Sequence, residues 1–141
     1  IQSFDQLRVI YPDVENALAN KQTMLHFNLA PRRGGWTQTF TGQQFWPMDP
    51  RPEEVHLEDI AHALANLCRY NGHTSSHYSV AEHCVLLSQV VSEENALWAL
   101  LHDATEAYIG DMVRPLKNFM PDYVAVEEAL MGVIATRFGL V

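Results

Sequence analysis

The feature that most limits how this chain can fold is a helical repeat of apolar residues, which begins near residue 55 and continues almost to the end. There, apolar side chains recur every three or four residues, the spacing that gathers them on one face of an α-helix. Near its start the repeat comprises Ile60, Leu64, Leu67 and Cys68. Near its end it comprises Val126, Leu130, Val133, Ile134 and Phe138. Because only short connections separate the repeats, residues 55–141 are expected to form an all-α bundle.

Local signals define the first two expected helices. Gly72 is expected to end the first helix, which carries Arg69 at its end. Ser79 and Glu82 form a capping box, in which the hydroxyl and the carboxylate satisfy the first free N–H groups of the second helix. The stripe expected to be buried on the second helix is Val85, Leu86, Val90 and Val91.

Two more helices are expected after the second one. The third runs roughly over residues 94–108, behind a second cap candidate at Ser92. The last begins at Pro121, a residue favoured in the first turn of a helix, and Gly139 follows its end. The helical core is therefore expected to contain four main helices.

The front of the chain follows a different pattern. Short helices are expected over residues 4–7 and 13–18. Residues 36–46 alternate between apolar and polar side chains around Thr41 and Gly42, which can turn, and this pattern is typical of a small β-hairpin.

The length of the chain sets its domain organisation. With 141 residues, of which 48% are apolar, the chain suits one globular domain with one core. We expect a single domain over residues 1–141. It would consist of an N-terminal extension over residues 1–54 and a helical metal-binding core over residues 55–141.

Charge limits the kinds of partner. Acidic residues outnumber basic ones by 17 to 9, and the formal net charge is −8. Duplex nucleic acid and anionic lipid surfaces are bound by basic faces, so neither is an expected partner. A small anionic ligand stays open, because a metal or a few local cations can reverse the field inside a cleft. No apolar run approaches the ~18 residues that cross a membrane.

The two cysteines are informative about the cellular compartment of the protein. Cys68 and Cys84 lie in apolar, helix-like surroundings and are expected to be reduced thiols of the core. The first residues show no basic segment followed by an apolar one, the pattern of a secretory signal. We therefore expect a cytoplasmic protein, and a homodimer remains open.

His102 and Asp103 are adjacent within an apolar stretch of the third expected helix. Burial of neighbouring ionisable groups is costly unless they are paired or hold a metal. A divalent cation can take a neutral imidazole nitrogen and a carboxylate oxygen together, and His83 on the second expected helix is the obvious further ligand. The alternative is a core histidine bonded to a backbone carbonyl.

Further polar residues follow this dipeptide. Glu106 lies four residues after His102, so the two are expected on one helical face, where a carboxylate could hold or deprotonate a metal-bound water. Asp111 comes at the end of the same helix. The alternative for Glu106 is a solvated surface position. The cations nearest in the sequence are Arg69, Arg114 and Lys117, which are solvated surface groups in the simpler interpretation.

Three ordered motifs resemble those of a known family. They are Tyr78-Ser79-Val80-Ala81-Glu82-His83, Leu100-Leu101-His102-Asp103-Ala104-Thr105-Glu106-Ala107-Tyr108-Ile109-Gly110-Asp111, and Pro115-Leu116-Lys117. In this order they resemble the HD-domain metal-dependent phosphohydrolases, and most closely the branch that includes the bacterial 5′-deoxynucleotidases. The resemblance covers roughly residues 36–140.

The resemblance implies a helical bundle that binds one divalent metal ion through His83, His102 and Asp103. The ion would be Mn, Co, Fe, Ni, Zn or Mg. A fourth ligand is expected from an Asp on a later helix. Asp122, at the start of the last helix, is the only Asp after Asp111. Either the coordination is completed beyond Val141, or three ligands and water hold the ion.

The resemblance also implies roles for the surrounding residues. Glu106 would position or activate the attacking water, and Asp111 would contact the sugar of a nucleotide. Arg69 and Lys117 would lie beside the phosphate, and His73 would line the same cleft. Glu106 and Asp111 are thus the expected catalytic residues, with Arg69, His73, Asp111 and Lys117 as the expected substrate-binding set.

The expected activity is hydrolysis of (deoxy)nucleoside 5′-monophosphates by a metal-activated water. One alternative is a hydrolase of another phosphate ester, such as a cyclic or polyphosphorylated nucleotide. The other alternative is a non-catalytic nucleotide-binding module with an incomplete metal site.

Overall fold

A computed structural model describes residues 31–140 of the chain. The short helices expected over residues 4–7 and 13–18 lie outside this range. Backbone contacts divide the chain into two compact units, residues 1–32 and 33–141.

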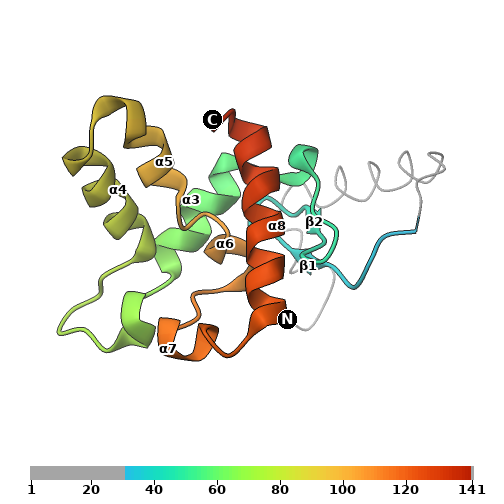
Figure 1. Cartoon of the computed structure of the whole chain (residues 1–141), viewed down its shortest axis with the longest axis horizontal. Coiled ribbons are helices and arrows are strands. Elements are labelled where there is room, and N and C mark those ends of the chain that lie inside the picture. The colour runs from blue at the N-terminus through green and yellow to red at the C-terminus, as the bar shows by residue number, and fades with distance from the viewer. Residues whose placement is uncertain (1–30, 141) are drawn as a thin grey trace, which may run out of the picture. The chain divides into compact units, whose positions relative to one another are not determined.

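The second unit is mostly helical and carries one small antiparallel hairpin (Figure 1). Its strands and α-helices are β1 (Thr37–Gln38), β2 (Gln44–Phe45), α3 (Leu57–Asn66), α4 (Val80–Val90), α5 (Ala96–Leu101), α6 (Glu106–Ile109), α7 (Arg114–Lys117) and α8 (Pro121–Phe138). Three 3-10 turns are η1 (Pro52–Glu54), η2 (Arg69–Gly72) and η3 (Glu93–Asn95). The expected mostly-α character is confirmed. Within residues 31–140, no helix is both long and apolar enough to cross a membrane.

One buried cluster holds these elements together. Its members are Phe45, Val55, Ile60, Leu64, Val80, Cys84, Leu101, Ala104, Leu130 and Ile134. They come from β2, from α3, α4, α5 and α8, and from connections between these elements. Leu130 and Ile134, four residues apart, give α8 its buried face, as the helical repeat predicts. The bounds of α8 also agree with the expectation, because Gly139 ends the helix in the left-handed conformation.

The hairpin lies within residues 36–46, as expected, and it packs on the helices. Thr37 pairs with Phe45 in antiparallel register. The backbone N–H and the hydroxyl of Thr41 donate to the buried Asp59 carboxylate of α3, at 2.7 and 3.0 Å. The ring of Phe45 stacks on that of Tyr108 in α6, with 4.0 Å between the centroids. The hairpin is therefore fixed to two helices of the core.

The first helix ends earlier than expected, at Asn66 rather than at Gly72. The reason is a second set of hydrogen bonds beyond it. Cys68 forms an antiparallel bridge with Ser79, and the Arg69 N–H donates to the Tyr78 carbonyl at 2.9 Å. This pairing keeps the chain extended, so Arg69 lies in η2 and not on α3.

The third expected helix is also interrupted. Instead of one helix over residues 94–108, α5 ends at Leu101 and α6 begins at Glu106. Between them, the N–H groups of Ala104 and Glu106 donate to carbonyls three residues back, both at 3.0 Å. These bonds close tight turns, which move His102 and Asp103 out of a regular helix.

The prediction of which face of α4 is buried is wrong. Val85, Leu86 and Val90 are 45%, 49% and 79% exposed. The helix instead buries Val80 and Cys84, which are four residues apart on another face. The exposed residues and the buried pair lie on different sides of the helix. The side with Val80 and Cys84 packs in the common core with α3 and α5.

Candidate metal centre

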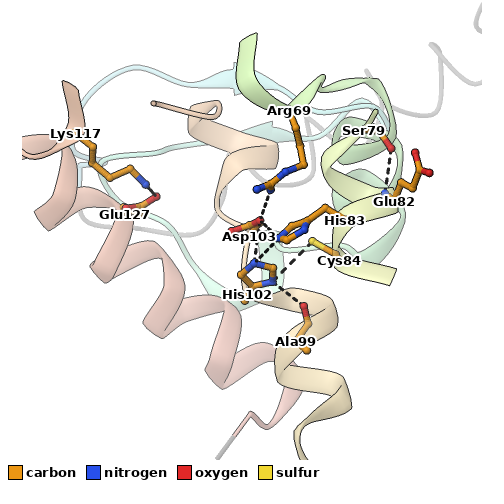
Figure 2. A network of polar contacts seen from close by, with 10 residues as sticks. All are labelled: Arg69, Ser79, Glu82, His83, Cys84, Ala99, His102, Asp103, Lys117 and Glu127. Atoms are coloured by element: carbon orange, nitrogen blue, oxygen red, sulfur yellow. Dashed lines mark hydrogen bonds and ion pairs between the residues drawn. The ribbon is translucent and has the colours of Figure 1, made fainter. Parts of the chain in front are cut away.

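Three side chains from two separate segments meet at one point (Figure 2). His83 Nε2 lies 3.3 Å from His102 Nε2 and 3.6 Å from Asp103 Oδ2. His102 Nε2 lies 3.0 Å from the same Asp103 oxygen. Among the described residues, this is the group of His, Cys, Asp or Glu side chains that is able to hold a metal ion. The residues expected to ligate a metal are thus brought together.

The size of this triangle suits a divalent cation. Metal bonds of about 2.1 Å place neighbouring ligand atoms about 3.0 Å apart at a right angle and about 3.4 Å apart at the tetrahedral angle. The three observed separations bracket these values. Two imidazole nitrogens and one carboxylate oxygen also form a donor set that several first-row metals accept. The residues present therefore fit such an ion.

The local fold fixes the direction of each ring. His83 lies in the first turn of α4, whose start is fixed by the capping bond from the Glu82 N–H to the Ser79 hydroxyl at 3.1 Å. His102 Nδ1 lies 2.7 Å from the Ala99 carbonyl, which can only accept, so this nitrogen is the donor. A neutral His102 then carries its lone pair on Nε2, the atom that faces the other two ligands. The bond to a backbone carbonyl that the alternative interpretation of His102 predicts is therefore present, and it also turns Nε2 toward the position that a metal ion would occupy.

The charges of the three groups are coupled. The hydrogen bond with Asp103 is the main cause that raises the pKa of His102 to about 10. Burial alone would raise the pKa of Asp103, but the hydrogen bond and the charge of His102 outweigh it, so that pKa is lowered. Burial and the charge of Arg69 lower the pKa of His83. A proton on His102 Nε2 therefore occupies the place that a cation would take.

Arg69 is the cation beside this group. Its Nη1 lies 3.4 Å from Asp103 Oδ2 (Figure 2), and its guanidinium carbon lies 5.2 Å from the centre of the Tyr70 ring. The Nε atom of Arg69 is buried, and no described residue provides it with a hydrogen-bond partner. Tyr70 and Asn71 both have positive φ angles, 54° and 52°, so the backbone turns sharply after Arg69.

Glu106 is a buried acid beside the candidate metal ligands. The residue is 7% exposed, and no described residue gives Oε2 a hydrogen-bond partner. Burial, together with the negative charges of Asp103 and Asp111, raises the pKa of Glu106 to about 8. The alternative of a solvated surface position is wrong, because Glu106 is in the interior at the start of α6.

The other expected site residues are not part of the His–His–Asp group. Asp111 follows Gly110, near enough for its charge to act on Glu106. Lys117 Nζ is 2.6 Å from Glu127 Oε1, so its ammonium is already paired (Figure 2). His73 is exposed just after η2, and Arg114 is exposed at the start of α7.

Sequence reasoning missed some neighbours of the site. The Cys84 thiol lies 3.9 Å from His102 Nδ1, and Tyr123 of α8 donates from its hydroxyl to the Gly110 carbonyl at 2.7 Å. Cys84 immediately follows His83, and this adjacency is the only sequence signal for it. Tyr123 has none, because its contact is tertiary.

The fold and the site together define a class of protein: a mostly helical unit that carries a His–His–Asp group. No family model matches the chain. It is similar to the uncharacterized protein YfdR of Escherichia coli (strain K12), with 47% identity over 103 residues. That alignment includes 73% of this chain and 58% of the relative. An uncharacterized protein of Rhodobacter capsulatus is 38% identical, over 74% of this chain and 59% of the relative. The chain therefore spans less than two thirds of the curated relatives it matches.

Proposed function

We propose that this chain is a metal-dependent phosphohydrolase of the HD-domain type that acts on (deoxy)nucleoside 5′-monophosphates. The observation that carries the proposal is the convergence of His83, His102 and Asp103, whose ligand atoms lie 3.0–3.6 Å apart. The resemblance of the ordered motifs to that family supplies the substrate class.

The pKa of Glu106 supports a role for this residue in proton transfer. When bound, a divalent ion would acidify a water molecule and polarise a phosphoryl oxygen. Glu106 is the nearby group with a pKa close to neutrality, about 8. Added positive charge beside Asp103 would lower that pKa, so the carboxyl could accept a proton and return it near neutral pH.

Arg69 and Asp111 take the remaining roles. The guanidinium of Arg69 reaches the edge of the centre at Asp103, where it would offset the negative charge of a phosphoryl group. Asp111 is proposed to contact the sugar. Because the Lys117 ammonium is already held by Glu127, phosphate binding is left to Arg69.

The test combines metal analysis with phosphate release. Purified chain would be loaded with Mn²⁺ and screened against ribo- and deoxynucleoside 5′-monophosphates, cyclic nucleotides and nucleoside polyphosphates. His102→Ala and Asp103→Ala are expected to lose metal and turnover together. Glu106→Gln is expected to keep the metal and lose turnover, and His77→Ala, at an exposed histidine outside the centre, serves as the matched control.

Each outcome separates the alternatives. Release from cyclic or polyphosphorylated nucleotides alone would assign a different phosphate ester as substrate. Metal binding without release from any of them would favour a binding module. Full activity of Glu106→Gln would remove Glu106 from the mechanism.

A further inference from the structure

Helix α6 and the segment that follows it carry the two proposed catalytic acids, Glu106 and Asp111. Glu106 begins α6, and Gly110 ends it with a φ angle of 82°, a conformation that favours glycine. The Gly110 N–H donates to the Glu106 carbonyl at 2.9 Å, and Asp111 follows directly. The backbone of Gly110 is therefore linked to both acids, to Glu106 through its N–H and to Asp111 through its carbonyl group.

The carbonyl of Gly110, which belongs to the peptide group shared with Asp111, is held from α8. The Tyr123 hydroxyl donates to the Gly110 oxygen at 2.7 Å, a short and partly buried hydrogen bond. Burial, together with the negative charges of Glu127, Glu106 and Asp111, raises the pKa of Tyr123 to about 12, so the hydroxyl stays a donor at neutral pH.

Lys117 and Glu127 hold the tyrosine in turn. The Lys117 ammonium lies 5.7 Å from the centre of the Tyr123 ring, within reach of a cation–π interaction. The same ammonium donates to Glu127 Oε1 at 2.6 Å, and both side chains are about three quarters buried or more. Tyr123 and Glu127 are four residues apart and so share one face of α8. We name these three residues, Lys117, Tyr123 and Glu127, the α7–α8 clamp.

We propose that the α7–α8 clamp positions Glu106 and Asp111 through the Gly110 carbonyl, and that Lys117 is a positioning residue rather than a phosphate ligand. The inference rests on the proposed function for its kinetic readout. It differs from the role that the family resemblance implies for Lys117.

The first variant removes only the hydrogen bond. Tyr123→Phe is expected to lower kcat for the best nucleoside 5′-monophosphate about tenfold, because small displacements of catalytic groups are costly. Mn²⁺ binding, measured by calorimetry without substrate, is expected to change less than about twofold, since no clamp residue belongs to the ligand triangle. An unchanged kcat in this variant would overturn the proposal.

Two further variants, Glu127→Gln and Lys117→Met, separate the two possible roles of Lys117 by their effects on KM and kcat. If Lys117 bound phosphate, Glu127→Gln would release its ammonium and lower KM, whereas Lys117→Met would raise it. If Lys117 acts as part of the α7–α8 clamp, both variants are expected to lower kcat. Glu128→Gln, at an exposed residue on the same helix, is the control and is expected to behave like the unaltered protein. A lower KM for Glu127→Gln would return Lys117 to the phosphate.

Amide hydrogen exchange keeps the clamp testable apart from the activity. Tyr123→Phe is expected to speed exchange at the Gly110 amide, which the unaltered protein protects through its bond to Glu106. Faster exchange without any phosphate release by the unaltered protein would support the clamp and contradict the proposed function. Unchanged exchange would contradict the clamp whatever the activity.

Discussion

At the scale of single residues, the candidate centre is governed by one shared position for a positive charge. His102 Nε2 and Asp103 Oδ2 are 3.0 Å apart, and a proton or a metal ion can lie between them and His83. The two occupants exclude each other, since each uses the same lone pair.

Metal affinity should therefore depend on pH. Because the pKa of His102 is raised to about 10 without an ion, binding at neutral pH must displace its proton. The apparent affinity for Mn²⁺ is expected to fall about tenfold for each unit by which the pH is lowered from 9 to 7. Calorimetric titrations at three pH values measure this slope, and an affinity independent of pH would show that no proton is displaced.

Glu106 predicts a pH dependence of stability in the metal-free protein. Its folded pKa, about 8, lies above the ordinary value of 4.5. The folded state thus binds more protons than the unfolded state between these values, and stability is lost as the pH rises through this window. Glu106→Gln cannot ionise, so it should be more stable than the unaltered protein at pH 8, by a few kcal/mol, and close to it at pH 4.

Thermal unfolding in the presence of a chelator checks this prediction. The difference in Tm between Glu106→Gln and the unaltered protein should grow steadily from pH 5 to pH 8. A constant difference would mean that the carboxyl is ionised at its ordinary pKa.

At the scale of elements, the sequence predicted helices better than their ends. The Ser79 hydroxyl cap and the glycine after α8 are local signals, and both are confirmed. The break between α5 and α6 was not predictable in this way, because apolar spacing continues across residues 102–105 while tight turns interrupt the helix. The prediction of the buried face of α4 failed for a related reason. A repeat of apolar residues shows that a helix face is apolar, but it does not show whether another element covers that face.

The site shows the same division. The convergence of His83, His102 and Asp103 could be predicted because these residues stand in an ordered motif. The engagement of Lys117 by Glu127 could not, because it depends on how α7 meets α8. Tertiary pairing of exposed-looking charges leaves no periodic signal in a sequence.

The attachment of the hairpin to α3 gives a prediction at this scale. Asp59→Ala removes both acceptors for Thr41 and leaves a partly buried N–H without its partner. The free energy of unfolding is expected to fall by about 1–3 kcal/mol. Glu58→Ala, an exposed neighbour on the same helix, should change it by less than about 0.5 kcal/mol. Equal effects of the two substitutions in urea unfolding would contradict a specific role for Asp59.

At the scale of the whole unit, the candidate centre joins α4 to the turn between α5 and α6. An ion held there would bind the folded chain and not the unfolded one, so binding should add to stability. Mn²⁺ at a hundred times its dissociation constant is expected to stabilise the unaltered protein by about 2.7 kcal/mol.

Differential scanning calorimetry with and without Mn²⁺ measures this gain as a rise in Tm. His102→Ala should show no rise at the same concentration, because it lacks one ligand of the triangle. An equal rise in both proteins would place the ion elsewhere on the chain.

The stack of Phe45 on Tyr108 also decides where this unit can be shortened. Phe45 is completely buried and belongs to the same cluster as α3 and α8, although it precedes every α-helix described. A fragment trimmed to residues 55–141 would lack that ring, and a cavity would open next to the short helix that begins with Glu106. We therefore expect a stable fragment of this unit to need the hairpin, so the boundary near residue 55, where the sequence pattern turns helical, is not a place at which to cut the chain.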